Sequence, residues 1–489
     1  MSIHVYNTLT ASKEEFVPIK AGKVGMYVCG PTVYDSCHIG HARAAVVFDV
    51  VYRYLKHRGF EVTYVRNYTD VDDKVIKRAN DEGKNFREVA DYYIDEYDRD
   101  MGSLKVLAPD IKPRVTDHIP EIIDTVQKLI DRGHAYESGG DVFFDVSSFE
   151  SYGKLSKRDK ESMSAGARVD INELKRNELD FALWKAAKPD EPQWDSPWGP
   201  GRPGWHIECS VMSAKYLAVP FDIHGGGIDL VFPHHENEIA QAEAATGTEP
   251  FAKYWIHNGH VTTHGEKISK SLGNFIPIPD LVDRWHPEAI RLFLLSNHYR
   301  SPVDYTEEAL DIAQDHVDRF YNALARADEK VVTESDKKST LPAAGEELET
   351  MIESFSEKFE QAMDSDFNTA GAVANMMELL KGFNRFLDRA DPASAKHREL
   401  IGGTADMLKK SGAVLGMLDE NPVEYLEERK RRKIAKSGMD ATLIDELVAK
   451  RAEARNGKDW AEADKIRDEL LDRGIVIKDG PKGTVWSVK

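Results

Sequence analysis

Four side chains that can bind a metal ion of intermediate softness occur in three short segments of this 489-residue chain. Cys29 follows an apolar run, and Cys209 lies in the segment WHIECS. His234 and Glu238 are four positions apart, so a helix would place them on one face. Two thiolates, an imidazole and a carboxylate form a donor set that suits tetrahedral Zn²⁺. A second interpretation stays open, because free cysteines are often buried as small apolar side chains.

The neighbouring residues do not extend this ligand set. His235 and Glu236 begin a metalloprotease-like sequence, but Ile239 stands where such a helix needs its second histidine. A helix turns His235 away from the face of His234, so we predict a structural role for it. Cys37 is predicted to pack in the core.

A tetrapeptide with two histidines could bind phosphate. His38 and His41 flank Gly40 between a predicted strand and a predicted helix. The N–H groups and partial positive charge of a helix N-terminus suit phosphate, and Gly40 allows a ligand to approach the backbone closely. The alternative is that both histidines are ordinary surface or capping residues.

A second candidate for phosphate binding is the segment KISKS, which contains Lys267 and Lys270. A lysine ammonium is a compact charge on a flexible stem, so it can follow a moving pyrophosphate group. The alternative is a solvated charged loop. The order of the two segments along the chain is more informative than either segment alone.

The elements that must position these residues follow an α/β order. Apolar runs predict strands at 24–29 and 60–65, and a helical pattern covers 39–58 and ends at Gly59. Strand, helix and strand in this order begin a Rossmann-type doubly wound parallel sheet. A turn at Ser138-Gly139-Gly140 predicts a hairpin within an inserted subdomain.

We therefore predict an α/β fold with an inserted subdomain, followed by an α-helical bundle and a small C-terminal domain. A polar segment at 328–345 indicates a surface connection, and a short hairpin is predicted near the C-terminus. The predicted parts are a first sheet half at 1–115, an insertion at 116–204, a second half with the KISKS loop at 205–300, a helical domain at 301–420 and a C-terminal domain at 421–489.

Composition limits the class of protein. No apolar run is long enough to span a membrane, and the N-terminus lacks the pattern of a secretory signal. Three cysteines predict a reduced, cytoplasmic protein without a disulfide framework. The net charge of −19 argues against indiscriminate nucleic-acid binding, but residues 421–489 hold 16 Lys and Arg against 14 Asp and Glu. Nucleic acid would have to be recognised by such local surfaces.

Together these motifs resemble the class I aminoacyl-tRNA synthetases and, within them, the cysteinyl-tRNA synthetase family. HIGH stands at 38–41, and the family's KMSKS motif stands as KISKS, with Ile268 replacing methionine by an apolar side chain of similar size. The resemblance covers essentially the whole chain. Matching stretches are YVCGPTVYD at 27–35, NYTD at 67–70, GRPGWHIECS at 201–210, HGGGIDL at 224–230, FPHHENE at 232–238, DFNT at 366–369, KDW at 458–460 and GTVW at 483–486.

The resemblance implies specific roles for residues of this chain. It assigns one Zn²⁺ per subunit to Cys29, Cys209, His234 and Glu238, and the amino-acid pocket to Cys29, Thr69 and Trp205, although Trp205 could be a plain core residue. It assigns ATP, accompanied by Mg²⁺, to His38, Gly40, His41, Lys267, Lys270, Gly225, Gly226, Gly227 and Asp229.

The implied activity is an ATP-dependent ligase that forms cysteinyl-adenylate, releases pyrophosphate and loads L-cysteine onto the 3′-terminal adenosine of tRNA(Cys). Zn²⁺ would select the thiol over the hydroxyl of serine, so no editing domain is expected. The C-terminal domain would bind the anticodon region, with Arg429, Arg431, Arg432 and Trp486 as candidates. Trp460 could also stack on anticodon bases, but Trp486 is the better candidate because Trp460 lies in a predicted helix and could be a core residue. The basic run at 429–433 could also be a solvated helix face. A monomer is expected.

Two alternatives share some of these features. A cysteine ligase that acts on an aminosugar in thiol biosynthesis would share the activation chemistry, but such enzymes lack the C-terminal tRNA-binding part. A non-catalytic tRNA-binding paralogue would be expected to have broken phosphate motifs, whereas both histidines and both lysines are present here.

Overall fold

The structure is a computed structural model that divides into two compact units. It describes residues 2–159, 173–263, 265–268, 275–332, 340–436, 441–480 and 483–488. The first unit comprises residues 1–317, 346–382 and 406–417, and the second comprises residues 318–345, 383–405 and 418–489.

A four-stranded parallel sheet in the order β10–β9–β3–β4 forms the centre of the first unit. Its strands are β3 (Lys23–Val28), β4 (Glu61–Arg66), β9 (Phe221–Gly227) and β10 (Ala252–Asn258). The carboxyl halves of these strands are buried, as expected for a parallel sheet covered by helices. The two strands predicted at 24–29 and 60–65 are confirmed with shifts of one residue at their ends.

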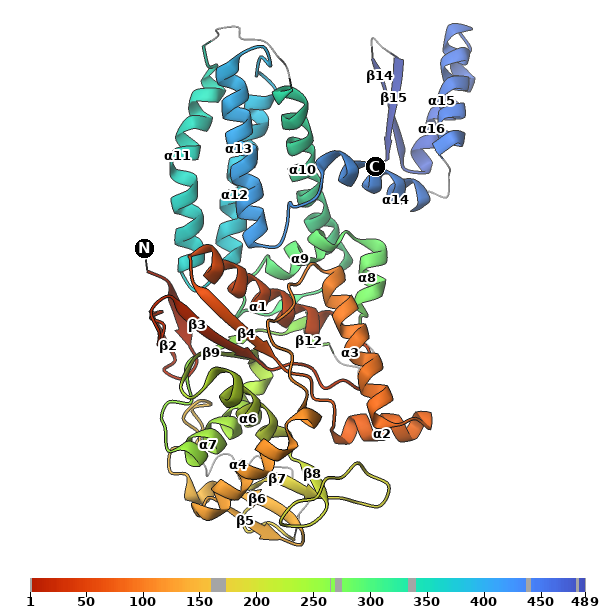
Figure 1. Cartoon of the computed structure of the whole chain (residues 1–489). Helices are drawn as coiled ribbons and strands as arrows, with labels where there is room; N and C mark the ends of the chain where they lie inside the picture. Colours follow the sequence, from red (N-terminus) through yellow and green to blue (C-terminus); the bar gives the residue numbers. More distant parts are fainter. Residues whose placement is uncertain are drawn as a thin grey trace. The chain divides into compact units, whose positions relative to one another are not determined.

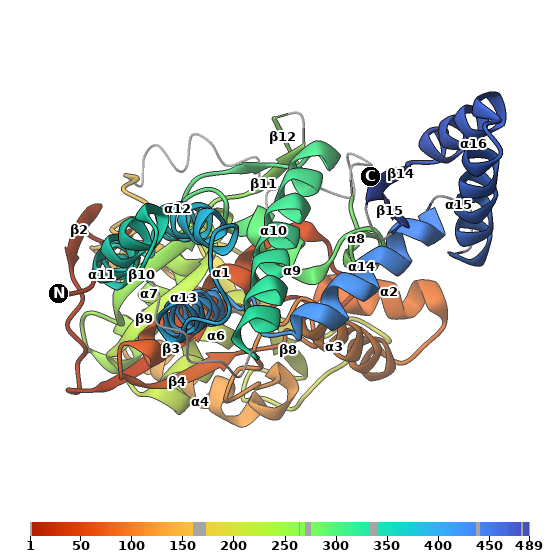
Figure 2. The same cartoon turned by 90° about the horizontal axis from the view of Figure 1, so that it is seen from above.

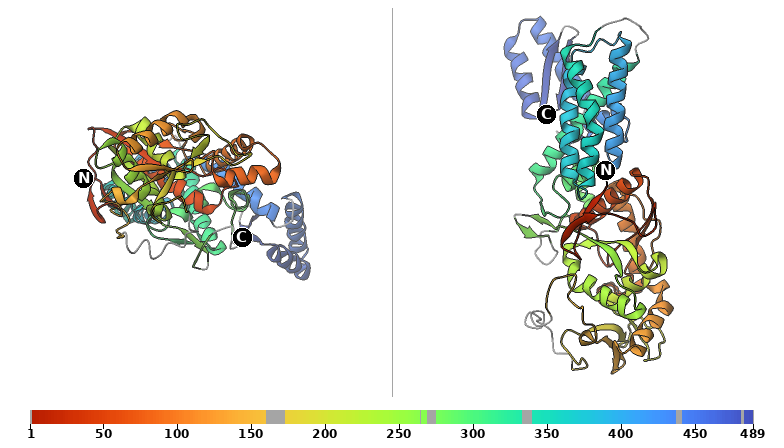
Figure 3. Two further views of the ribbon diagram at one scale, coloured as in Figure 1. Left: turned by 90° about the horizontal axis from the view of Figure 1, so that it is seen from below. Right: turned by 90° about the vertical axis from the view of Figure 1, so that its left-hand side faces the viewer.

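Helices cover both faces of this sheet. Helix α1 (Ile39–His57) lies on one face, and α6 (Trp205–Leu217) and α7 (Glu236–Thr246) lie on the other (Figures 1 and 3). Gly59, which follows α1, has φ of 86°, a left-handed conformation that favours glycine. The predicted helix and its end are therefore confirmed.

The inserted segment builds a separate antiparallel sheet. The strand order is β5 (Ala135–Ser138), β6 (Asp141–Phe144), β7 (Phe181–Ala186) and β8 (Gly201–Pro203), with α4 (Ile119–Asp131) before it. Gly139 and Gly140 both have positive φ, as the two-residue turn of a tight hairpin requires. The predicted hairpin is confirmed.

The remaining elements are mostly helical after residue 306. Before it lie β1 (His4–Asn7), β2 (Ser12–Glu15), α2 (Asp73–Glu82), α3 (Phe86–Ser103), β11 (Val261–Thr263), β12 (Glu266–Lys267), α8 (Ile278–Arg284), α9 (Pro287–Leu295) and β13 (Val303–Asp304). After it lie the long helices α10 (Glu307–Val331), α11 (Ala343–Asp364), α12 (Thr369–Leu387) and α13 (Ala395–Val414). The predicted polar connection falls partly outside the described residues.

The end of the chain forms a small part with its own core within the second unit. It contains α14 (Pro422–Lys436), α15 (Ala441–Asn456), α16 (Trp460–Asp472) and the hairpin β14 (Ile475–Gly480) and β15 (Gly483–Val488). Helices α15 and α16 run side by side, and the hairpin lies close to them (Figure 2). Ile444, Ile466 and Leu470 supply buried apolar contacts, and the predicted terminal hairpin is confirmed.

The predicted fold class is confirmed by the parallel sheet, the insertion and the helical region that follows. The proposed boundaries at 115, 204, 300 and 420 stay predictions, because the two compact units are divided in another way. Within the described residues, no helix combines the length and the apolar character that a membrane span requires.

Candidate metal centre and adjoining cleft

The four predicted metal ligands meet at the carboxyl end of the parallel sheet. The ligand atoms of Cys29, Cys209, His234 and Glu238 all lie within 4.8 Å of one another. The two sulfur atoms are 3.7 Å apart, and His234 Nε2 lies 2.9 Å from Glu238 Oε1. Cys29 is partly exposed, and the other three residues are buried.

The register of the sheet explains how residues so far apart meet. Strands β3 and β9 pair in parallel with Val28 opposite Gly225, and the N–H of Cys29 donates to the carbonyl of Gly225 at 3.1 Å. Cys29 therefore lies where both strands end. Helix α6 presents Cys209, and the spacing of four residues between His234 and Glu238 directs both side chains to the same place.

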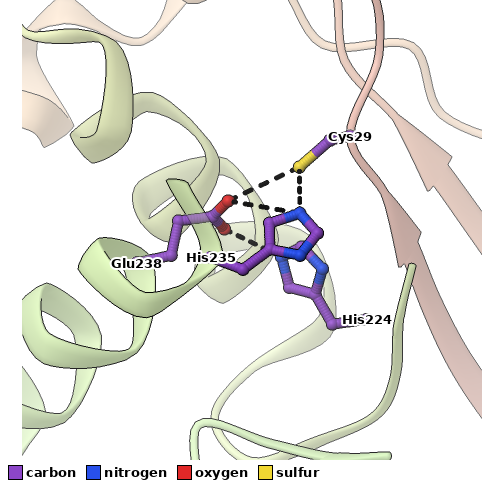
Figure 4. Close-up of side chains that lie close together, drawn as sticks. All are labelled: Cys29, His224, His235 and Glu238. Carbon is purple, nitrogen blue, oxygen red and sulfur yellow. Dashed lines mark hydrogen bonds and ion pairs between the residues drawn. The ribbon is translucent and has the colours of Figure 1, made fainter. Parts of the chain in front are cut away.

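A second set of donors overlaps the first. Cys29, His224, His235 and Glu238 also lie within 4.8 Å of one another (Figure 4). His224 Nε2 lies 2.8 Å from Glu238 Oε2, and His235 Nε2 lies 3.3 Å from Cys29 Sγ. The prediction that His235 points away is therefore wrong. His235 is three positions before Glu238, and this spacing also places two side chains close together on a helix.

His224 was missed by sequence reasoning, although a signal exists. It directly precedes Gly225 near the end of β9, the edge at which parallel sheets place their ligands. Its ring is fully buried and stacks on Trp255 with centroids 4.3 Å apart. His224 thus supports the second oxygen of Glu238 while the first faces His234.

Burial and mutual charge set the protonation of the cluster. A hydrogen bond from Cys29 outweighs burial and lowers the pKa of Cys209 to about 6, whereas burial and the hydrogen bond to Cys209 raise the pKa of Cys29. Burial opposes the charge of His234, but Glu238 and Cys209 raise its pKa to about 10. The pKa of Glu238 is lowered because His224 and His234 outweigh burial. The lowered pKa values of Cys209 and Glu238 favour negative charge in the cluster, which a divalent cation can balance.

The two histidines of the tetrapeptide cap helix α1. His38 Nδ1 accepts from the N–H of Gly40 at 3.0 Å, and His41 Nδ1 accepts from the N–H of His38 at 3.2 Å. The capping alternative is therefore correct as far as Nδ1 is concerned. An imidazole that accepts at Nδ1 carries its proton at Nε2 when neutral.

A cleft of about 760 Å³ adjoins the metal candidates and the capped helix. Its lining includes Cys29, His38, Gly40, His41 and Trp205, and also Gly227 and Asp229. Trp205 is 38% exposed and stacks on His234 with centroids 4.2 Å apart, so it is no plain core residue. Most of the predicted amino-acid and nucleotide residues therefore share one cavity.

Three predicted pocket residues have other surroundings. Thr69 is buried and donates its hydroxyl to Glu208 Oε2 at 2.8 Å. A Cβ on Gly225 would lie 2.3 Å from the ring of Phe48, and one on Gly226 would lie 2.8 Å from the ring of His235. Among the described lining residues only Gly227 of the three glycines occurs. Gly225 and Gly226 thus make room for protein side chains, and their predicted role beside the adenosine stays a prediction.

The lysines of the KISKS segment are only partly described. Lys267 pairs with Thr262 through its backbone, in the short strand pair β11–β12, and its side chain is outside the description. Lys270 lies outside the described residues. Ile268 is buried and lines the cleft, which places the start of this segment beside the capped helix.

The C-terminal candidates differ in availability. Arg429 is buried and pairs with Asp318 at 3.1 Å, and Arg432 pairs with Glu428 one helical turn away at 2.8 Å. Arg431 is exposed. Trp486 donates its Nε1–H to Asp445 at 2.6 Å, and Lys430 Nζ lies over its ring.

Trp460 is 58% exposed and is the first residue of α16, so the alternative of a core residue does not apply to it. A residue in the first turn of a helix need not face the helix partner. The basic run is partly tied to acidic neighbours, so Arg431 is its most accessible arginine among the three candidates.

Comparison with known proteins gives a consistent result along the chain. Residues 15–315 match the family described as tRNA synthetases class I (C) catalytic domain, residues 358–419 match the DALR domain, and residues 441–486 match the cysteinyl-tRNA ligase anticodon binding domain. The chain is 53% identical to a cysteine–tRNA ligase of Geobacter sp. (strain M21) and 51% identical to that of Geobacter metallireducens, over the full length of each protein.

Solved structures show the same fold at low sequence identity. The methionyl-tRNA synthetase of Mycobacterium tuberculosis in complex with methionyl-adenylate is 16% identical, with a TM-score of 0.63. The match covers 86% of this chain and 94% of that chain.

Proposed function

Because this chain belongs to the cysteinyl-tRNA synthetase family of class I aminoacyl-tRNA synthetases, we propose that it activates L-cysteine with ATP and transfers it to the 3′-terminal adenosine of tRNA(Cys). The observation that carries this proposal is the position of the two-thiol cluster. It adjoins the same cleft that the capped helix and its two histidines line. A binding place for a thiol thus lies next to one for phosphates.

The donor set of the cluster fits Zn²⁺. Two sulfur atoms, an imidazole nitrogen and a carboxylate oxygen lie within the span of a single ion, and the charges of Cys209 and Glu238 favour a divalent cation. Cys29, Cys209, His234 and Glu238 would hold it. A bound Zn²⁺ supplies a Lewis acid that prefers a soft thiolate to a hydroxyl.

The selectivity for cysteine follows from this chemistry. Cysteine and serine are almost the same size, so the shape of a pocket discriminates poorly between them. Trp205, which stacks on His234, can cover the substrate side chain and exclude water from it. We propose that serine is rejected at this site without a separate editing step.

Different residues of the cleft would contact different parts of the substrates during the activation step. The carboxylate of cysteine attacks the α-phosphorus of ATP, the bond to the bridging oxygen breaks, and pyrophosphate leaves. His38 and His41, which cap the N-terminus of helix α1 through their Nδ1 atoms, would contact phosphate oxygens. Lys267 and Lys270 would bind pyrophosphate together with Mg²⁺, and Asp229 would accept from the ribose. In the second step, the 2′-hydroxyl of the terminal adenosine attacks the carbonyl carbon and AMP leaves.

The aminosugar ligase is not favoured. The relatives match over the full length, including the anticodon binding domain at 441–486. We also propose a cytoplasmic, monomeric protein. The three cysteines all carry thiols, which supports a reducing compartment.

The test is ATP–pyrophosphate exchange with cysteine and with serine, before and after treatment with a zinc chelator. We expect exchange with cysteine alone, loss of exchange after chelation and recovery on addition of Zn²⁺. Exchange with serine at a rate close to that with cysteine would refute the role of the metal in selectivity. Absence of exchange with cysteine in the zinc-loaded protein would refute the proposed function.

A further inference from the structure

Arg66 is a buried cation at an end of the cleft to which the activation step assigns no role. It is the last residue of β4, only 4% of its surface is exposed, and it lines the cleft. Its Nε and Nη2 donate to the hydroxyl of Tyr64 at 2.9 and 2.6 Å, and its Nη1 donates to the hydroxyl of Tyr97. In the part of the chain that the structure describes, this guanidinium contacts no carboxylate.

A buried guanidinium with only phenol partners is unusual. Charged side chains are rarely buried without an opposite charge, because removal from water is costly. Arginine has five N–H donors, and three hydrogen bonds do not use them all. Tyr97 accepts from Arg66, and burial raises its pKa to about 12, so it keeps its own proton for an acceptor. Arg66 and Tyr97 together form a donor site for an anion.

The order of the strands indicates which anion. The proposed ribose-binding residue Asp229 follows β9, Cys29 and the two histidines of the capped helix follow β3, and Arg66 ends β4 on the far side of β3 from β9. Because the strands are parallel, their carboxyl ends follow one another along the same cleft. Arg66 therefore lies beyond the amino-acid site as seen from the adenosine site. The adenylate phosphate belongs to the adenosine side, whereas the second substrate must reach the carbonyl carbon from a side that AMP does not occupy.

The surroundings of Arg66 suit single-stranded nucleic acid. Tyr34, Tyr93 and Tyr97 also line the cleft, and Lys74 Nζ lies 5.3 Å from the centre of the Tyr34 ring. Lys74 is exposed. Aromatic rings beside cations are the usual means by which proteins hold unpaired nucleotides through stacking and phosphate contacts.

We propose that Arg66, supported by Tyr97, binds the phosphodiester that precedes the terminal adenosine of the tRNA and so positions the 3′-ribose for transfer. This inference rests on the proposed function, since it requires tRNA as the acceptor. A phosphate of ATP has the same chemistry as a phosphodiester, so the test must separate the two sources.

The test combines the variant R66M with tRNA in which that one linkage is a neutral methylphosphonate. Single-turnover transfer from preformed cysteinyl-adenylate is measured for each pair of enzyme and tRNA, and cysteine-dependent pyrophosphate exchange is measured without tRNA. We expect the neutral linkage to slow wild-type transfer about 10- to 100-fold, the range of a charge-assisted hydrogen bond. R66M should show a similar loss with normal tRNA, little further loss with the neutral linkage, and exchange within about twofold of wild type.

R78M is the matched control. Arg78 lies on α2, donates to the hydroxyl of Tyr93 at 2.8 Å and pairs with Glu82, and it is absent from the described lining of the cleft. This variant should keep the full sensitivity to the neutral linkage. If R66M does not fold, R66K replaces it in the test, because lysine keeps the charge but not the planar guanidinium. Transfer by R66K should be less sensitive than wild-type transfer to the neutral linkage.

Each result decides the matter. The inference is overturned if the neutral linkage slows transfer by R66M, or by R66K in its place, as much as it slows transfer by the wild type. A loss of R66M that appears in pyrophosphate exchange assigns the anion to ATP and also overturns it. Failure of the wild-type protein to exchange pyrophosphate with cysteine would instead remove the proposed function itself, which separates the two failures.

Discussion

The sulfur atoms of Cys29 and Cys209 lie 3.7 Å apart, although 180 positions separate these residues in the chain. The distance is far too long for a disulfide, and both residues carry thiols. Two thiols so close in a reduced protein are a natural place for a thiolate-binding metal.

Removal of one sulfur should remove the metal. We expect Cys209→Ala to lower Zn²⁺ affinity at least about 100-fold and to abolish cysteine-dependent exchange, because a three-donor set holds the ion weakly. Metal content after dialysis and pyrophosphate exchange measure both effects. Cys37→Ala removes a buried thiol that lies outside the cluster, so it should retain one Zn²⁺ per chain. Full metal content in Cys209→Ala would contradict the assignment.

The two roles of His38 can be separated by choice of substitution. Asparagine is a good N-cap but has no donor at the place of Nε2, so His38→Asn should slow adenylate formation about 100-fold without loss of thermal stability. His38→Ala should lose the same activity and about 1 kcal/mol of stability as well. Exchange kinetics and thermal unfolding check the pair. Normal activity in His38→Asn would show that His38 acts only as a cap.

The glycines before Asp229 should be sensitive to a single methyl group. A Cβ at residue 226 would lie 2.8 Å from the ring of His235, so Gly226→Ala should cost about 1–3 kcal/mol of stability and weaken Zn²⁺ binding. Gly102→Ala is the matched control, because it meets nothing within 4 Å in helix α3 and should be neutral or stabilising. Urea unfolding and metal titration distinguish them. Unchanged stability of Gly226→Ala would contradict the packing argument.

Asp100 should destabilise the protein at neutral and higher pH. Burial, assisted by Glu96 and opposed by Arg99, raises its pKa to about 6, whereas an unfolded chain has a value of about 3.9. Folding therefore favours the protonated form, and stability is lost as the pH rises through about 6. We expect Asp100→Asn to be more stable than wild type by about 1–3 kcal/mol at pH 8, with the gain vanishing near pH 4.

Thermal unfolding across this range measures the effect of Asp100. Asp95→Asn, an exposed residue of the same helix, should stay within about 0.5 kcal/mol of wild type at each pH. A pH-independent gain for Asp100→Asn would show that titration is not its cause.

The basic run of α14 should separate into structural and binding residues. Arg429→Ala breaks the pair with Asp318 and should cost about 1–3 kcal/mol of stability. Arg431 is exposed, so Arg431→Ala should leave stability unchanged, weaken tRNA binding a few-fold and reduce the salt slope by about one. Binding assays at several salt concentrations and thermal unfolding test both. Unaltered tRNA affinity of Arg431→Ala would exclude it from the interface.

Local sequence signals predicted the elements well. The apolar runs around Val24 and Val62 and the left-handed Gly59 predicted strands and a helix end that the structure contains, because these features depend on a few neighbouring residues. The spacing of His234 and Glu238 likewise predicted their common face. Their donor chemistry grouped these two with Cys29 and Cys209 as a candidate zinc set, and the family resemblance assigned Zn²⁺ to that set.

Signals that depend on distant contacts were missed. His224 reaches Glu238 because helix α7 packs its first turn against the end of β9, and His235 reaches Cys29, which is 206 positions away in the chain. Gly225 leaves space for the ring of Phe48, and Gly226 leaves space for the ring of His235. Neither contact follows from the residues next to these glycines in the sequence. The proposed anion site depends on the order of the strands around Arg66 and on Tyr97 from helix α3. The periodicity of apolar residues in the sequence therefore does not reveal it.

The order in which the metal-binding side chains occur along the chain also sets when the site can form in the cell. A chain that has left the ribosome only as far as the end of the insertion contains Cys29 and none of the other three donors. Helix α7 must be synthesised before the set is complete. Binding of the proposed ion would therefore be a late event in biosynthesis, because it requires both halves of the split sheet.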